Sequence, residues 1–240
     1  MLDDIQYLVS KYNLSFIWFA DSTFTANKNT NLEIAQGIID RKIDIAWRCH
    51  SRVLELNKFN KEDFILLENS GLDQIYLGVE SLCNNVQKLI HKVFSPDKVT
   101  EIVQEMKGLH IRIVMSFIYG FPGVSQDDFE VCMPYFEKWK SINPEVYYQC
   151  GFYTPYPGTP MTEKAVSLGY SLPKNLEEYG DFDVYYGLEN KNIELPWMKK
   201  EYCINYINNI KKKFPSHNGV FELWEKRKKN KLPAFQKEES

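Results

Sequence analysis

The stretch SGLDQIYLGVES, residues 70–81, joins the end of a helix to a buried strand. Gly71 follows a segment of helical period and is typical of a residue that ends a helix, because glycine adopts the left-handed conformation at little cost. The run QIYLGV, residues 74–79, is nearly continuous in apolar residues, which indicates a parallel strand covered on both faces. Glu80 follows directly, so a carboxylate is expected at the carboxyl end of this strand.

Similar runs of apolar, β-branched or aromatic residues occur along the first 154 residues of the chain. The others are SFIWFA (15–20), IDIAWRC (43–49), IRIVMSFIYG (111–120) and VYYQCGFYT (146–154). Longer segments of helical period separate them, in the repeat of one strand and one helix. The sequence therefore predicts an α/β fold, either an open sheet or a TIM-like (β/α) barrel, of about five parallel strands.

Helix starts are indicated where a capping side chain precedes a helical segment. These places are Asn60 with Asp63, Ser95 with Pro96, and Ser125 with Asp128. Gly108, like Gly71, marks a helix end.

Two parts of the chain differ in character. No low-complexity linker occurs before about residue 170, so residues 1–170 are predicted as one partial barrel. Residues 171–240 are predicted as a C-terminal extension, which begins irregularly and continues as an amphipathic helix over MKKEYCINYINNIKKKF, residues 198–214. The basic run EKRKKNK near the end is interpreted as a solvated tail, with an acidic partner as the alternative.

Composition excludes several classes of protein. The 240 residues carry a formal charge of −3, with 44% hydrophobic and 25% charged residues, which predicts no general attraction to nucleic acid or to an anionic membrane. The N-terminus has two acids where a signal peptide is basic, and no apolar run reaches the length of a membrane helix. The five cysteines form no CxxC pair, so we expect reduced thiols and a cytoplasmic protein. They are Cys49, Cys83, Cys132, Cys150 and Cys203.

Polar residues that follow the apolar runs are the candidates for a site, because ligands of parallel α/β folds bind beyond the carboxyl ends of the strands. Asp21 and Glu80 suit an amine, a ribose diol or acid–base chemistry, and the alternative is that they cap the helices that follow. Arg52 suits a carboxylate or phosphate, or a structural ion pair. His50 and His91 have no ligand spacing and are interpreted as ordinary residues.

Two glycine- and proline-rich turns follow the last two apolar runs. Gly120 and Gly123 bracket Pro122 in a turn that allows the backbone to approach a ligand. The segment TPYPGTP, residues 154–160, forms a rigid wall after its strand. A purely structural turn is the alternative in both places.

Five segments, taken in order, resemble the radical S-adenosylmethionine (radical SAM) enzymes, in the branch whose members often carry a cobalamin-binding domain ahead of the barrel. The resemblance covers residues 1 to about 170. The segments are FADSTFTANK (19–28), WRCHSR (47–52), SGLDQIYLGVES (70–81), LIHKVFSPDKVTEIVQEMKGLHIRIVMSFIYGFPG (89–123) and YTPYPGTPM (153–161). They are similar to the family's segments at strands two, three, four, five and six.

The departures from the family are informative. Members bind a 4Fe-4S cluster through a CxxxCxxC loop after strand one, and the 240 residues contain no such triplet. The resemblance therefore implies a partial barrel whose first strand is missing, which leaves FIWFA as an apolar edge strand. Ser22 replaces the second aspartate of its motif, Leu82 and Cys83 replace small residues, and Val124 stands where a glutamate is expected.

The resemblance also implies roles for individual residues. In intact relatives, S-adenosylmethionine is reductively cleaved to methionine and a 5′-deoxyadenosyl radical. Asp21, Arg52 and Glu80 would contact the polar groups of S-adenosylmethionine. Gly120 and Pro122 would shape the adenosine pocket, and Tyr153 and Tyr156 would wall the sixth strand. No residue of the chain is implied as a cluster ligand or as a catalytic residue.

Three hypotheses follow for function. The first is the greater part of a radical SAM barrel, inactive until a partner chain or a missing N-terminal segment supplies strand one and CxxxCxxC; the 4Fe-4S cluster and cobalamin are then implied only for intact relatives. The second is a non-catalytic remnant or accessory module that binds a nucleotide-like ligand or a protein. The third is an unrelated barrel hydrolase that uses Asp21 and Glu80.

Overall fold

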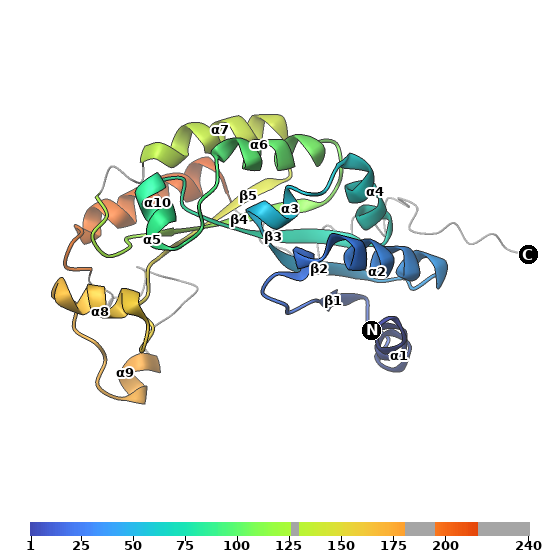
Figure 1. The fold of residues 1–240 in the computed structure, drawn as a ribbon, viewed down its shortest axis with the longest axis horizontal. Helices are drawn as coiled ribbons and strands as arrows, with labels where there is room; N and C mark the ends of the chain where they lie inside the picture. The colour runs from blue at the N-terminus through green and yellow to red at the C-terminus, as the bar shows by residue number, and fades with distance from the viewer. Residues whose placement is uncertain (126–129, 181–194, 216–240) are drawn as a thin grey trace, which may run out of the picture.

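The computed structural model describes residues 1–125, 130–180 and 195–215. Five parallel strands form one sheet in the order β1-β2-β3-β4-β5 (Figure 1), so the predicted α/β fold is confirmed. The strands are β1 (Phe16–Trp18), β2 (Ala46–Arg52), β3 (Leu72–Glu80), β4 (Arg112–Tyr119) and β5 (Val146–Phe152). The helices are α1 (Leu2–Tyr12), η1 (Phe24–Ala26), α2 (Lys28–Asp40), α3 (Val53–Leu56), α4 (Lys61–Asn69), α5 (Asn84–Leu89), α6 (Pro96–Glu105), α7 (Met133–Ile142), α8 (Pro160–Ser167), α9 (Leu176–Gly180) and α10 (Lys200–Lys213).

All five strands differ by a few residues from their predicted runs, and the differences at β1 and β2 move candidate site residues. β2 begins at Ala46, three residues later than the apolar run, and Lys42 in the turn before it has a positive φ of 52°. His50 and Arg52, which we expected after the strand, therefore lie within it. β1 ends at Trp18, so Asp21 lies in the loop beyond the strand and not directly at its end.

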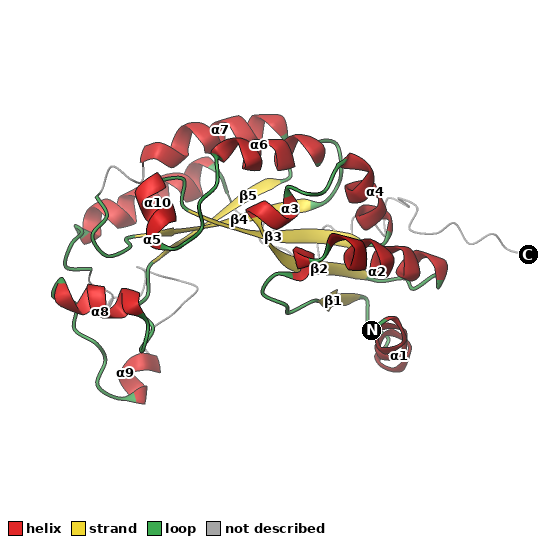
Figure 2. Ribbon diagram, in the orientation of Figure 1, coloured by secondary structure: helices red, strands yellow, loops and turns green. Residues whose placement is uncertain are grey.

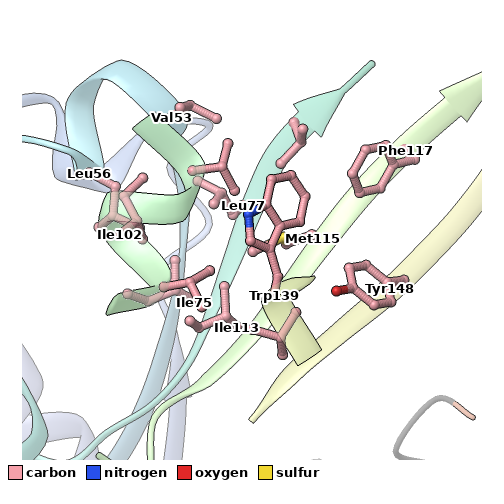
Figure 3. Close-up of a cluster of buried hydrophobic side chains, with 14 of the residues drawn as sticks. Val53, Leu56, Ile75, Leu77, Ile102, Ile113, Met115, Phe117, Trp139 and Tyr148 are labelled. Atoms are coloured by element: carbon pink, nitrogen blue, oxygen red, sulfur yellow. The ribbon is translucent and has the colours of Figure 1, made fainter. Parts of the chain in front are cut away.

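The hydrophobic core lies between the sheet and the helices on one side of it. Figures 1 and 2 show α2, α4, α6 and α7 on the same side of the sheet. Alternate residues of β3 and β4 point toward these helices and are fully buried, as Leu77 and Met115 are. Figure 3 shows Trp139 of α7 among them, and its Nε1–H donates to Thr100 Oγ1 at 2.9 Å. The opposite face of the sheet is not covered by these four helices.

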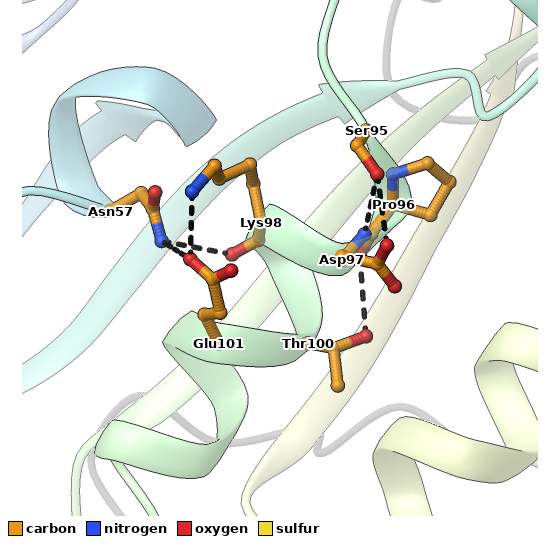
Figure 4. A network of polar contacts seen from close by, with 7 residues as sticks. All are labelled: Asn57, Ser95, Pro96, Asp97, Lys98, Thr100 and Glu101. Carbon is orange, nitrogen blue, oxygen red and sulfur yellow. Dashed lines mark hydrogen bonds and ion pairs between the residues drawn. The ribbon is translucent and has the colours of Figure 1, made fainter.

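Two predicted helix starts are confirmed. The Asn60 side chain accepts from the Asp63 N–H at 2.9 Å, and the Asp63 carboxylate accepts from the Asn60 N–H at 2.8 Å, which forms a capping box. Ser95 accepts from the Asp97 N–H ahead of α6, whose first residue is Pro96 (Figure 4). The third start involves Asp128, which lies outside the described residues, as does the basic run at 225–231.

The predicted C-terminal amphipathic helix is present as α10 and packs on the helix side of the sheet. Its buried residues include Tyr206 and Ile210. Phe214, which follows it, stacks edge-on against Tyr148 of β5 at 5.2 Å between ring centroids. The apolar face of α10 therefore belongs to the same core as residues of the sheet.

Within the described part of the chain, β1 and β5 are the edge strands of the sheet. The expected edge position of the FIW strand is thus confirmed, and Trp18 at its end is 44% exposed. None of the helices described is long and apolar enough to span a bilayer.

Candidate functional site

The face of the sheet opposite the core carries polar and aromatic side chains. Arg48 and His50 of β2, Tyr76 of β3 and Ser116 of β4 are half-buried, and Gln149 of β5 is exposed. Successive side chains of a strand point to opposite faces, so these residues alternate with the buried core residues of the same strands. We call this the inner face.

One row of the inner face runs across four strands, from Arg52 at the carboxyl end of β2 to Gln149 in the middle of β5. Arg52 pairs with Gly78, Gly78 pairs with Ser116, and Ser116 pairs with Gln149. Ligands of parallel α/β folds bind beyond the carboxyl ends of the strands, so the part of the row at the ends of β2 and β3 is the candidate site. Of the row, only Arg52 was predicted as a site residue; Gly78, Ser116 and Gln149 were not.

Glu80 extends this row from the end of β3. Its Oε1 atom pairs with Lys92 Nζ at 2.8 Å, and its Oε2 atom accepts a hydrogen bond from Ser116 Oγ at 3.1 Å. A Cβ atom on Gly78 would lie 2.8 Å from Glu80 Oε1. Because Gly78 has no side chain, the Glu80 carboxylate can fold back over β3 at the position that pairs with Arg52.

Asp21 lies apart from Glu80. It is exposed in the loop between β1 and η1, and its carboxylate has no hydrogen bond or ion pair with another described residue. The loop itself is anchored, because Phe19 stacks on Phe24 at 4.4 Å and the Thr25 and Ser51 hydroxyls share a hydrogen bond of 2.5 Å.

The glycine–proline turn after β4 is a type II turn. The Val124 N–H donates to the Phe121 carbonyl at 3.2 Å, with Pro122 and then Gly123 at the two central positions and a φ of +81° at Gly123. The space that a Cβ of Gly120 would need is filled by Leu195, whose Cδ1 would be 2.5 Å away. Gly120 thus makes room for the chain's own C-terminal segment.

The two tyrosines after β5 differ in exposure. Tyr153 is buried, and its N–H donates to the Tyr119 carbonyl at 2.7 Å. Burial raises the pKa of Tyr153 above its ordinary value. Tyr156 is 54% exposed, and its carbonyl accepts from the Thr162 hydroxyl at 2.6 Å, so its backbone is fixed while its ring is at the surface.

His50 lies on the inner face, a position that its sequence context, which has no metal-ligand spacing, did not indicate. Its ring lies 5.4 Å from that of Trp18 and 5.0 Å from that of Tyr76. The guanidinium of Arg48 lies 4.3 Å from the centroid of the Trp18 ring. Burial, followed by the charge of Arg48, lowers the pKa of His50 below its ordinary value of 6.5, so the neutral imidazole is favoured.

This lowered pKa predicts a pH effect on stability. Below pH 6.5 the unfolded chain binds a proton at His50 that the folded chain resists, so the free energy of unfolding falls as the pH is lowered. His50→Gln removes this proton uptake. We expect urea unfolding between pH 7 and pH 5 to show a smaller loss of stability for His50→Gln than for the wild type. Parallel pH profiles for the two proteins would contradict the assignment.

The described residues do not fit an iron–sulfur cluster. Among residues 1–125, 130–180 and 195–215, no group of three or more histidine, cysteine or acidic side chains is placed to hold a metal ion. Cys49, Cys83 and Cys132 are buried, and burial raises the pKa of the Cys49 thiol well above its ordinary value. These thiols are packed as small apolar residues.

The family of the chain follows from comparison with known proteins. The profile of the Radical SAM superfamily matches residues 1–133, which is more than half of the 240 residues. The chain belongs to the radical SAM superfamily. This confirms the predicted family and replaces the alternative of an unrelated hydrolase.

Two curated relatives extend the similarity beyond the matched region. An uncharacterized methyltransferase of Pyrococcus horikoshii is 28% identical over 227 residues, 92% of this chain and 48% of that protein. The anaerobic magnesium-protoporphyrin IX monomethyl ester cyclase of Rubrivivax gelatinosus is 22% identical over 201 residues, 84% of this chain and 33% of that protein. The chain thus spans less than half the length of these radical SAM relatives.

Solved structures share the fold. The radical SAM methyltransferase TsrM from Kitasatospora setae, solved with cobalamin and a 4Fe-4S cluster, has a TM-score of 0.56 at 15% identity over 70% of this chain and 33% of its own. Coproporphyrinogen III oxidase HemN from Escherichia coli, a radical SAM enzyme, has a TM-score of 0.52 at 16% identity over 68% of this chain and 39% of its own.

Proposed function

We propose that this chain is the part of a radical SAM enzyme that binds S-adenosylmethionine. The observation that carries the proposal is the arrangement around Glu80 at the carboxyl end of β3. The Glu80 carboxylate lies over Gly78, which pairs with Arg52 of β2, and accepts a hydrogen bond from Ser116 of β4. Since Gly78 has no side chain, a polar ligand that binds the Glu80 carboxylate can approach the backbone of β3 closely.

Each residue of the row has a distinct part in this proposal. The Glu80 carboxylate would accept hydrogen bonds from the ribose diol or the ammonium group of S-adenosylmethionine. The planar guanidinium of Arg52, which is exposed and has no partner among the described side chains, would bind the carboxylate of the methionine moiety. Asp21, on its anchored loop, would meet the ligand from the edge of the sheet.

Bound S-adenosylmethionine supplies the chemistry of the family, which is its reductive cleavage by an iron–sulfur cluster. The chain's own residues would orient the ligand and shield it from water. Because the described cysteines do not fit a cluster, we propose that a segment outside these 240 residues supplies the three cysteines, from the same protein or from a partner chain. In the branch that this chain resembles, a cobalamin-binding domain would also lie outside these residues.

Equilibrium dialysis of the full chain against labelled S-adenosylmethionine tests the proposal. We expect saturable binding that Arg52→Met weakens about tenfold, because a charge-assisted pair is lost. Arg41→Met is the matched control, since Arg41 pairs with Asp3 and precedes the amino end of β2, whereas Arg52 lies at its carboxyl end. Absence of saturable binding, or equal binding by Arg52→Met, would contradict the proposal and favour an accessory protein without this ligand.

A further inference from the structure

Glu80 sits at the centre of a strained turn. Its φ is +64°, and the Ser81 N–H donates to the Val79 carbonyl at 2.8 Å across it. A three-residue turn with this hydrogen bond and a positive φ is a rare form of γ-turn. The same place carries a shift in register between β3 and β4. A residue other than glycine in this conformation is strained, and it persists only where its surroundings hold it.

Gln87 of α5 binds the residue that follows the turn, Ser81. Its side chain is buried, its Nε2 donates to the Ser81 carbonyl at 3.0 Å, and its Oε1 accepts from the Phe94 N–H at 3.3 Å. Its own carbonyl accepts from the Lys92 N–H at 2.9 Å. The buried side-chain amide of Gln87 thus links Ser81, the residue after Glu80, to Phe94, two residues beyond Lys92.

Lys92 contacts the side chain of Glu80 itself. The loop that carries it reverses at His91, which has a φ of +55°. The Lys92 ammonium group then reaches Glu80 Oε1 at 2.8 Å, while Ser116 donates to Glu80 Oε2 at 3.1 Å. Each carboxylate oxygen is therefore held by one protein donor and retains acceptor capacity for a ligand.

We propose that Gln87 and Lys92 are positioning residues that hold the Glu80 carboxylate ready to accept hydrogen bonds from the ligand. The ligand contact of Glu80 rests on the proposed function, whereas the clamp on the turn does not. Segment 81–94, which includes α5, holds Glu80 in two ways. Gln87 fixes the backbone of the turn, and Lys92 fixes the side chain of Glu80. An acceptor held in place before binding loses less side-chain entropy when the ligand arrives.

Amide hydrogen exchange of the full chain tests the clamp without any ligand. Gln87→Leu and Lys92→Met are compared with Lys98→Met, which removes a lysine from the exposed ion pair with Glu101. We expect exchange at the Ser81 amide to rise at least about tenfold in the first two variants and to stay at the wild-type rate in the third. Wild-type exchange at Ser81 in both Gln87→Leu and Lys92→Met overturns the inference.

A double-mutant cycle tests the positioning role with S-adenosylmethionine as the probe. Lys92→Met is expected to weaken binding about tenfold in the wild type but less than about twofold in Glu80→Gln, because Lys92 acts through Glu80. Lys92→Arg, which keeps the charge, restores most of the affinity. Equal losses in both backgrounds overturn the inference, because Lys92 then contacts the ligand directly or acts only on stability.

The two measurements separate failure of this inference from failure of the proposed function. No binding by the wild type contradicts the proposed ligand, and the exchange of the Ser81 amide still decides the clamp. Weak binding by Glu80→Gln together with unchanged binding by Lys92→Met contradicts the positioning role while the proposed ligand stands.

Discussion

Arg112→Met is expected to lower the free energy of unfolding by about 3–5 kcal/mol, because it removes one member of a buried ion pair. Arg112, at the start of β4, is 2% exposed and pairs with Asp73 of β3, which is fully buried. Without the guanidinium, the Asp73 carboxylate stays buried but loses the cation with which it pairs. Urea unfolding at neutral pH, followed by circular dichroism, measures the change.

Two variants serve as controls for this prediction. Lys213→Met removes the exposed pair with Glu137 and should change stability by less than about 1 kcal/mol. The double variant Asp73→Leu/Arg112→Met replaces the buried pair by apolar side chains and should recover much of the loss. An Arg112→Met protein as stable as Lys213→Met would show that the buried pair does not have this structural importance.

Gly71→Ala is expected to destabilise the protein by about 3 kcal/mol or more, because a strained conformation and a backbone collision add. Gly71 has a φ of +98°, and a Cβ there would lie 2.0 Å from the carbonyl oxygen of Ile45. Its own carbonyl accepts from the Trp47 N–H at 2.9 Å, so the residue cannot move without disturbing the start of β2. The same urea titration measures the loss.

Gly108→Ala is the matched control for Gly71→Ala. Gly108 has a φ of +84°, but no atom lies within 4 Å of its added Cβ. Only the conformational cost remains, about 1 kcal/mol. Equal losses in the two variants would show that the close approach to Ile45 is not what makes Gly71 necessary.

These two glycines also show how far the sequence predicts the fold. Both were correctly predicted from local pattern as ends of helices, because a left-handed residue at a helix end is a local property. The collision with Ile45 depends on a strand that pairs from elsewhere in the chain, so nothing around Gly71 indicates it. The strands were found for a similar local reason, since runs of apolar, β-branched or aromatic residues are a local pattern, although the inner face of the sheet is only half-buried.

The candidate site was predicted unevenly. Arg52 and Glu80 were found because they follow buried strands, and the structure places them at the same end of neighbouring strands. Asp21 was placed at a strand end, but β1 ends earlier and the residue lies in a loop. Gln87 was missed because a polar residue in a short helix resembles a solvated one, and its partners Ser81 and Phe94 become neighbours only through folding.

We propose that this radical SAM chain provides the ligand-binding face of the barrel but not the ligands of the iron–sulfur cluster. Anaerobic reconstitution with iron and sulfide, performed on the full chain alone and on the chain mixed with a polypeptide that carries a CxxxCxxC segment of the family, tests this proposal. We expect a stoichiometric 4Fe-4S absorbance band that co-purifies with the chain only in the mixture. A 4Fe-4S band formed by the chain alone would contradict it.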